Sequence, residues 1–266
     1  MVPTYLNKRN SILADKMGLG KTIQTVVYIN SVAKILHKHS PFLVIAPLFT
    51  VTHWYREFAS LTNLNTLAYH GSAKNREHIT EFEFAFVKDR PCCLTHNQSF
   101  LKKCHGLKAA KWERTWMVDV VITTPELLVT DDYAELSYVP WELLVVDEAH
   151  RMKNNTSRFA SNLREGRFKF GRSLLLTGIP IQNNMNELWA LLNFLDPETF
   201  DSVDEFLESY GTIMEKEQMD DLHESIRPYI LCRLKEDIEK SVPPKEETVV
   251  EVELTILQKQ YSVFTP

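Results

Sequence analysis

The sequence predicts an α/β fold built on a doubly wound parallel sheet. Short apolar runs of strand length recur along the chain, and segments with helical periodicity separate most of them. Strands that alternate with helices pair in parallel, because each helix carries the chain back to the same edge of the sheet. The two polar motifs that could carry chemistry each follow such a run directly. This placement agrees with the fold class, in which ligands bind at the carboxyl ends of strands.

The expected elements follow from apolar runs and their spacing. Strands are expected at Ile12–Ala14, Phe42–Ala46, Leu67–Tyr69, Val118–Thr123, Leu143–Val146 and Leu174–Thr177. A helix is expected from Lys21 to about His37, because its apolar residues recur with helical spacing. Between Lys88 and Trp116 (residues 88–116) this periodicity fails, so we expect a surface insertion there.

The sequence pattern changes in the last part of the chain. From about Pro197 to Lys240 we expect helices and no strands, for instance at Val203–Tyr210 and Met219–Ser225. The pair Pro243-Pro244 breaks the helical pattern, and Thr248–Leu254 then alternates as a strand would. We therefore predict a first domain over 1–195, a helical extension and brace over 196–242, and a linker segment over 243–266.

Composition favours a soluble, intracellular protein. Hydrophobic residues make up 44% of the 266 residues, which is enough for a full core. No apolar run approaches the roughly 20 residues that a membrane span needs, so we expect no membrane partner. The formal net charge of −5 argues against a generally basic nucleic-acid footprint. Any contact with DNA therefore has to be local.

The cysteines do not indicate a disulfide framework or a zinc site. The chain has four, which are too few and too unevenly placed for a secreted disulfide-rich protein. A cluster of possible zinc ligands comprises Cys92, Cys93, His96, Cys104 and His105. Its spacing matches no common finger, and two adjacent cysteines cannot easily face one metal, so we predict no zinc.

Residues 11–24, SILADKMGLGKTIQ, have the features of a phosphate-binding loop. An apolar strand leads into a turn, and a helix then begins, whose free N–H groups attract an anion. Gly20 allows close approach of a phosphate, Lys21 brings a positive charge to it, and the Thr22 hydroxyl is placed to ligate Mg²⁺. The predicted nucleotide-binding residues are Asp15, Met17, Gly18, Leu19, Gly20, Lys21 and Thr22. Asp15 stands where the strict pattern has glycine.

Residues 143–154, LLVVDEAHRMKN, supply the carboxylates that such a site needs. Asp147 would hold Mg²⁺ together with Thr22, and Glu148 would orient the attacking water. Alone, either motif is explained by a glycine turn at a helix start or by an acidic cap after a core strand. Together and in this order, they predict an ATP and Mg²⁺ site in which Lys21, Asp147 and Glu148 are catalytic.

The motifs also carry a family resemblance. Five segments resemble, in order, helicase-type motifs of the Swi/Snf ATPases: ILADKMGLGKTIQ, PFLVIAPLFTVTHWYREF, VVITTPELL, LLVVDEAHRMKN and LLLTGIPIQNNMNELWALLNFLDPETF. Within that family, YHGS, DPETF, RLKEDIEK and PPKEE are most similar to the chromodomain-helicase-DNA-binding (CHD) remodellers, including their Kismet-like branch. The resemblance covers nearly the whole chain.

The resemblance implies a nuclear motor that uses ATP to translocate on duplex DNA and slide nucleosomes. This chain would be the first of two RecA-like lobes, and 243–266 would begin a truncated second lobe. Thr177, Gly178 and Pro180 would couple nucleotide to DNA. The implied DNA-facing residues are Thr50, Trp54, Thr123, Thr124, Lys153 and Asn154. A packing role for Trp54, a strand end at Thr123, and capping or salt bridges for Lys153, Asn154 and the nearby Arg151 explain them equally well.

Three residues depart from the family pattern. Lys16 replaces an acidic residue in the phosphate loop, Ile179 replaces threonine in the coupling motif, and Cys232 replaces arginine in the helix that braces the two lobes. The glutamine element that grips adenine and the arginine fingers of the second lobe have no counterpart here. Such arginines contribute roughly 10³ to 10⁵ in rate in related NTPases, so we expect this chain alone to be a poor ATPase.

These departures keep a second function open. The chain could be a non-catalytic regulatory or binding protein that keeps the fold without the reaction. A generic RNA helicase lobe would fit the acidic motif, but it explains LNFLDPETF and the helical extension poorly.

Overall fold

The structure is a computed structural model that describes residues 1–16, 18–36, 41–86, 115–130, 134–137, 139–152, 158–164, 168–178, 185–210, 222 and 224–233. The chain divides into two compact units, Met1–Leu234 and Lys235–Pro266, and the second lies outside the described residues. Most of the predicted insertion and the predicted strand Thr248–Leu254 lie outside them as well. The predicted domain boundaries at 195 and 242 therefore stay predictions.

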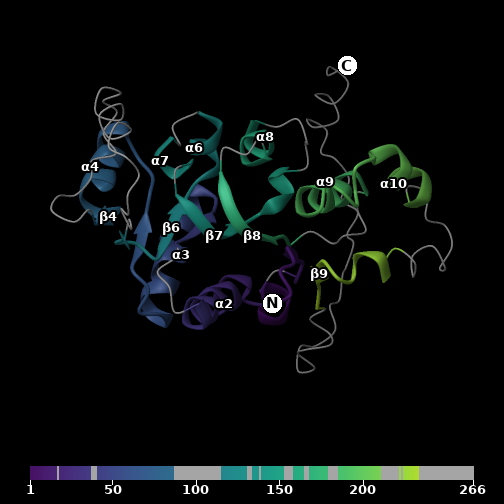
Figure 1. The fold of residues 1–266 in the computed structure, drawn as a ribbon, viewed down its shortest axis with the longest axis horizontal. Coiled ribbons are helices and arrows are strands. Elements are labelled where there is room, and N and C mark those ends of the chain that lie inside the picture. The colour runs from purple at the N-terminus through teal and green to yellow at the C-terminus, as the bar shows by residue number, and fades with distance from the viewer. Residues whose placement is uncertain are drawn as a thin grey trace, which may run out of the picture. The chain divides into compact units, whose positions relative to one another are not determined.

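The first unit is built on one sheet, with strand order β3-β6-β2-β7-β8-β1-β9 and parallel pairing throughout (Figure 1). Its strands are β1 (Ser11–Leu13), β2 (Phe42–Ile45), β3 (Thr66–Ala68), β6 (Val120–Thr123), β7 (Pro140–Val146), β8 (Lys169–Leu176) and β9 (Ile230–Leu231). A separate antiparallel pair joins β4 (Ala85–Phe86) to β5 (Thr115–Trp116). Every strand predicted from an apolar run within the described residues is present, so the predicted fold class is confirmed.

One prediction is wrong: strands do not stop at Pro197. β9 pairs in parallel with β1, with Ile12 opposite Ile230 and Leu13 opposite Leu231. The strand is only two residues long, too short to show alternation, and it forms because the edge of β1 offers unpaired backbone groups. For the same reason Cys232 directly follows a strand and does not lie in a helix.

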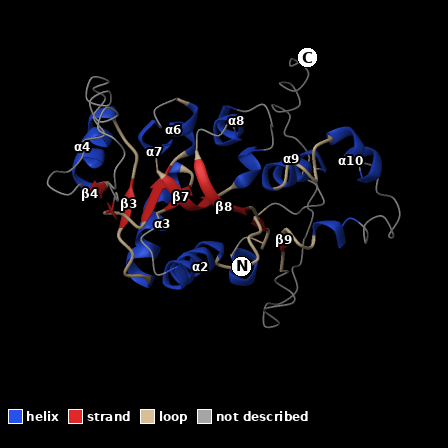
Figure 2. Cartoon of the chain, in the orientation of Figure 1, coloured by secondary structure: helices blue, strands red, loops and turns tan. Residues whose placement is uncertain are grey.

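Helices cover both faces of the sheet, as Figure 2 shows. They are α1 (Val2–Leu6), α2 (Lys21–Leu36), α3 (Leu48–Leu61), α4 (Ala73–Glu83), α6 (Pro125–Val129), α7 (Ala134–Ser137), α8 (Arg158–Arg164), α9 (Met185–Leu195) and α10 (Val203–Tyr210), with a 3₁₀ turn η1 (Ala149–Met152). The predicted helices at 21 to about 37 and 203–210 are confirmed as α2 and α10. Only part of the predicted helix over 219–225 is described.

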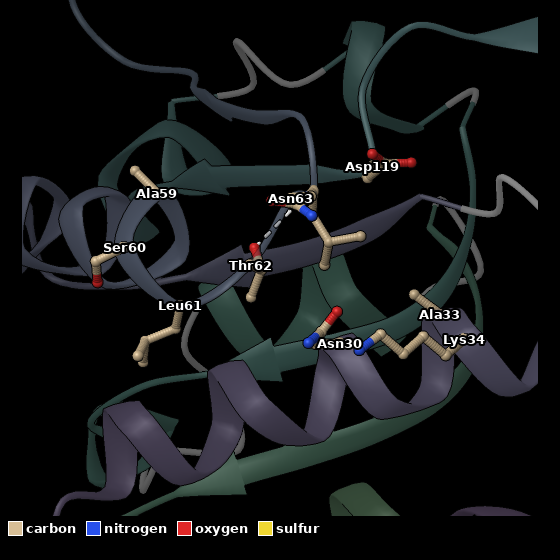
Figure 3. A pocket seen from close by; sticks show the side chains of 10 residues that line it. Asn30, Ala33, Lys34, Ala59, Ser60, Leu61, Thr62, Asn63 and Asp119 are labelled. Carbon is tan, nitrogen blue, oxygen red and sulfur yellow. Dashed lines mark hydrogen bonds between the residues drawn. The ribbon is translucent and has the colours of Figure 1, made fainter.

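A hollow of about 630 Å³ lies where the carboxyl-terminal ends of α2 and α3 meet (Figure 3). Asn30 and Lys34 of α2, Ser60 of α3 and Asp119 line it. Asp119 directly precedes β6, so this hollow is at the amino edge of the sheet. It is therefore on the opposite edge from the phosphate loop, which follows the carboxyl end of β1.

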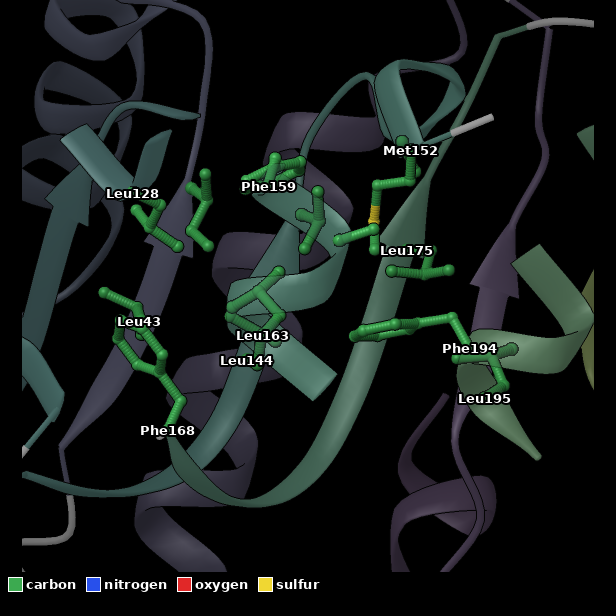
Figure 4. Close-up of a cluster of buried hydrophobic side chains, with 14 of the residues drawn as sticks. Leu43, Leu128, Leu144, Met152, Phe159, Leu163, Phe168, Leu175, Phe194 and Leu195 are labelled. Atoms are coloured by element: carbon green, nitrogen blue, oxygen red, sulfur yellow. The ribbon is translucent and has the colours of Figure 1, made fainter. Parts of the chain in front are cut away.

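The core has two halves, one on each face of the sheet. In the interior strand β2, Leu43 and Ile45 pack with the buried residues of α6, α8 and α9, whereas Phe42 and Val44 pack with those of α2 and α3. Figure 4 shows the first half, in which Leu43, Leu144 and Leu175 of three neighbouring strands meet the helices above them. Successive strand residues point to opposite faces, so apolar residues at every position are expected in a sheet covered on both sides.

The first prediction tests this core. Leu43→Ala should lower the free energy of unfolding by roughly 2–5 kcal/mol, because Leu43 is fully buried and the truncation leaves a cavity. Leu48→Ala is the matched control, since Leu48 is 61% exposed at the start of α3 and should change stability by about 0.5 kcal/mol or less. Urea denaturation followed by circular dichroism measures both, and equal losses would contradict the described core.

Candidate functional site

Three loops converge at one edge of the sheet because three strands end there in register. β8 lies between β1 and β7, with Leu13 opposite Leu176 and Val146 opposite Leu175. The phosphate loop follows β1, Thr177 and Gly178 follow β8, and Asp147 and Glu148 follow β7. Residues far apart in the sequence are thus brought together by parallel pairing alone.

The predicted phosphate loop turns at two glycines between β1 and α2. Gly18 and Gly20 have φ angles of 85° and 70°, a region that residues with side chains rarely adopt. A Cβ built on Gly20 would have no atom within 4 Å, so the space in front of the loop is open. α2 begins at Lys21, whose Nζ donates a hydrogen bond to the backbone oxygen of Asp15 at 2.9 Å. Met17 lies outside the described residues.

The acidic pair is held by the fold around it. Asp147 Oδ2 accepts a hydrogen bond from Trp54 Nε1 at 2.9 Å, and Asp147 Oδ1 accepts one from the backbone N–H of Glu148 at 2.9 Å. The carboxylate of Asp147 is therefore oriented by an indole from α3.

Glu148 stands in a strained backbone conformation. Its φ of 51° lies in the left-handed region, which costs a residue with a side chain roughly 1–2 kcal/mol. Its Oε2 lies 3.1 Å from His150 Nδ1, close enough for an ion pair if the imidazole is protonated. The geometry does not make a hydrogen bond, and these two buried atoms have no other hydrogen-bond partner among the described residues. Glu148 therefore combines backbone strain with an unpaired carboxylate oxygen among the described residues.

The predicted DNA-facing residues separate into two groups. Trp54 is fully buried and bound to Asp147, and Thr123 is fully buried and donates a hydrogen bond to the backbone oxygen of Tyr69 at 3.0 Å. The structure therefore agrees with the packing role for Trp54 and with the strand-end role for Thr123. Thr50 is half-buried in the first turn of α3, and Thr124 is the N-cap residue of α6.

Several other predicted site residues are not among the residues that the structure describes. Lys153, Asn154, Pro180 and Ile179 lie outside the described residues, as does the cysteine and histidine cluster considered for zinc. Arg151 forms an exposed ion pair with Glu126, with Nη1 and Oε1 at 3.2 Å, which is the salt-bridging role left open for it. Within the described part of the chain, no helix is long and apolar enough to cross a membrane.

Sequence reasoning missed the partners of Asp15. This carboxylate is fully buried, and it accepts hydrogen bonds from the backbone N–H of Arg233 at 3.0 Å, from Arg233 Nη2 at 2.6 Å and from Gln24 Nε2 at 3.1 Å. The hydrogen bond to Asp15 raises the pKa of the Arg233 guanidinium, so it stays charged. An acidic residue in place of the glycine of the strict pattern is the signal that could have prompted a search for such a partner.

Lys16 and Cys232, two of the departures, lie beside this group. Lys16 is exposed, and its backbone oxygen accepts a hydrogen bond from the N–H of Leu19 at 3.4 Å. The Cys232 thiol donates to the backbone oxygen of Ala14 at 3.3 Å, and burial followed by the charge of Asp15 raises the pKa of that thiol. The hydrogen bonds given above for the phosphate loop form with Lys16 and Cys232 in place.

A family comparison identifies this arrangement. The model of the SNF2-related domain matches residues 1–265, almost the whole chain. The chain belongs to the SNF2-related family. Its SNF2-related domain is 40% identical over 257 residues to human chromodomain-helicase-DNA-binding protein 8 and, equally, to human chromodomain-helicase-DNA-binding protein 6. Each match covers 97% of this chain and 9% of the relative, so the chain spans about a tenth of the length of these proteins.

Solved structures agree with the SNF2-related assignment. The Sulfolobus solfataricus SWI2/SNF2 ATPase core in complex with dsDNA matches with a TM-score of 0.64 and 28% identity, over 87% of this chain and 42% of that one. The Sulfolobus solfataricus SWI2/SNF2 ATPase core domain matches with a TM-score of 0.62 and 28% identity, over 98% of this chain and 47% of that one. The RecA-like P-loop fold and the resemblance to CHD remodellers are thus confirmed.

The second prediction tests the strain at Glu148. Glu148→Gly should raise the free energy of unfolding by about 1 kcal/mol, because glycine adopts a φ of 51° without steric cost. Lys169→Gly, at an exposed position of β8, should lower it by a similar amount, since glycine weakens a strand. Thermal unfolding of the unchanged chain and the two variants measures both changes in stability. A loss of stability in Glu148→Gly would contradict the strain.

Proposed function

We propose that this chain is the ATP-binding first lobe of a DNA-dependent chromatin-remodelling ATPase, and that it binds Mg-ATP at the carboxyl edge of its sheet. The observation that supports this most directly is the convergence of the phosphate loop, Thr177 and the acidic pair at the ends of β1, β8 and β7. Membership of the SNF2-related family supports the same reading.

The residues present fit Mg-ATP. The open space in front of Gly20 admits a phosphate, and the N–H groups at the start of α2 with Lys21 would balance its charge. The Thr22 hydroxyl and Asp147 would hold Mg²⁺, which prefers oxygen ligands. Bound Mg²⁺ neutralises charge on the phosphates. Lys21, held by the oxygen of Asp15 in this structure, would exchange that hydrogen bond for the phosphate.

Glu148 is the proposed catalytic carboxylate of the pair. The Glu148 side chain is 29% exposed, and its carboxylate can accept a hydrogen bond from a water molecule, so orient it, and then take its proton as general base. His150, 3.1 Å away, limits the directions in which the carboxylate can turn. We propose that turnover also needs a second RecA-like lobe. The match spans 42% of the Sulfolobus core, less than half of that relative.

We propose that duplex DNA contacts this same edge, at the start of α3. The free N–H groups of a 14-residue helix begin there, and Thr50 is partly exposed in its first turn. Thr124, Lys153 and Asn154 remain proposed contacts. The Sulfolobus relative was solved with dsDNA, and the names of the two human relatives specify DNA binding. By likeness to them, nucleosomes in the nucleus are the proposed setting.

The third prediction tests nucleotide binding. Lys21→Ala should weaken the affinity for Mg-ATP roughly ten- to hundredfold, because it removes charge-assisted hydrogen bonds to phosphate. Lys34→Ala is the matched control, an exposed lysine at the far end of the same helix, and it should bind as the unchanged chain does. Calorimetric titration measures the affinity of the unchanged chain and of both variants. Equal affinities for the two variants would contradict a phosphate-binding role for Lys21.

Lys16 is the observation that favours a second candidate, a non-catalytic regulatory or binding protein. The same titration with Lys16→Glu, which restores the charge of the family, separates the two. Binding by the unchanged chain supports the motor lobe. Binding by Lys16→Glu alone would name Lys16 as the lesion and support the second candidate.

The fourth prediction concerns the support of Asp147. Trp54→Phe should lower stability by about 1–3 kcal/mol and weaken the affinity for Mg-nucleotide roughly tenfold, because Asp147 loses the donor that orients it. Trp141→Phe is the control: its equally buried indole donates to the backbone oxygen of Leu136 at 2.9 Å. It should lower stability similarly and leave affinity unchanged. If both variants lose affinity, the loss comes from the weakened fold and not from the missing hydrogen bond to Asp147.

A further inference from the structure

One polar network joins the phosphate loop to the end of the described chain. Arg233 donates to both carboxylate oxygens of Asp15, through its backbone N–H and Nε to Oδ1 at 3.0 and 3.3 Å and through Nη2 to Oδ2 at 2.6 Å. The same Nη2 also donates to Gln24 Oε1. Gln24 in turn donates to Asp15 Oδ2 at 3.1 Å and to the backbone oxygen of Leu19 at 2.7 Å.

The burial of Asp15 makes this network obligatory. Its side chain has no exposed surface, and an ionised carboxylate without partners is very costly to bury. Arg233 supplies most of the hydrogen bonds in a two-pronged geometry that a lysine cannot reproduce. The side chain of Arg233 is 41% exposed, so solvent reaches one side of the pair and weakens its electrostatic part.

The network reaches the atoms that would face a phosphate. Gln24 fixes the backbone of Leu19, the residue between the two glycines of the loop. The backbone oxygen of Asp15 holds Lys21 Nζ at 2.9 Å. When Lys21 leaves that oxygen for a phosphate, the carboxylate of Asp15 is still held from the other side by Arg233. The loop can therefore release its lysine without losing its anchor.

Arg233 also stands at the exit from the first unit. β9 pairs with β1, and Tyr229, just before it, donates its hydroxyl hydrogen to Asp196 Oδ2 at 2.7 Å, so the segment approaching Arg233 is fixed. The chain then passes, through residue 234, into the unit Lys235–Pro266.

We propose that Arg233 is a positioning residue that sets the conformation of the phosphate loop through Asp15 and Gln24, and so supports nucleotide binding at that loop. The claim about loop conformation stands on the hydrogen bonds alone. The claim about nucleotide rests on the proposed function.

Hydrogen–deuterium exchange tests the loop without any ligand. In Arg233→Gln, amides over residues 14–24 should exchange roughly tenfold faster at a temperature well below unfolding, and Arg233→Lys should recover part of the protection. Arg227→Gln, an exposed arginine six positions before Arg233, is the matched control and should leave them unchanged. If Arg233→Gln unfolds at a lower temperature but exchanges normally at the loop, Arg233 is only structural and the proposal is wrong.

A double-mutant cycle tests the coupling to nucleotide. Arg233→Gln and Asp15→Asn should each weaken the affinity for Mg-ADP roughly tenfold, and the double variant should bind no more weakly than Asp15→Asn alone, because both changes break one network. Losses that multiply would overturn the proposed route through Asp15. If the unchanged chain binds no Mg-ADP, the proposed function fails, and the exchange experiment alone decides the role of Arg233. Should Asp15→Asn not fold, the comparison of Arg233→Gln with Arg233→Lys carries the test.

Discussion

The parallel pairing of β8 with β1 on one side and β7 on the other is the constraint on which the site depends. It aligns Leu13, Leu176 and Val146 at the same edge. No side chain of the phosphate loop forms a described hydrogen bond to Asp147 or Glu148. The two motifs meet because their strands pair in parallel and end at the same edge. The helices on both faces cover this sheet, so successive residues of each strand are apolar.

Core and site are therefore not separate parts of this molecule. Trp54 packs among the apolar residues under α2 and α3, and its indole nitrogen orients Asp147. Asp15 is as buried as the core leucines, yet it anchors a loop that faces open space. The hydrogen bonds that orient Asp147 and hold the loop therefore start from buried residues, and of the residues described at this edge Glu148 is the non-glycine residue with a positive φ.

Features that depend on residues close together in the sequence could be predicted, and features that depend on distant residues could not. The strands, α2 and the two motifs depend on neighbouring residues, so apolar periodicity and the glycines located them. β9 was missed because two residues show no period. The bond between Asp15 and Arg233 joins positions 218 residues apart, and no local pattern reports such a pair. Trp54 and Thr123 were ambiguous because burial, which distinguishes packing from contact with DNA, depends on the whole fold.

The central claim is that the loop and the acidic pair form one nucleotide site, and the most direct test is a crystal structure of the chain with ADP and Mn²⁺ in place of Mg²⁺, using anomalous scattering to locate the metal. We expect the β-phosphate on the backbone N–H groups of residues 18–22 and the metal between the Thr22 hydroxyl and Asp147, with Trp54 still bound to that carboxylate. A nucleotide bound elsewhere, or a metal remote from Asp147, would contradict this account.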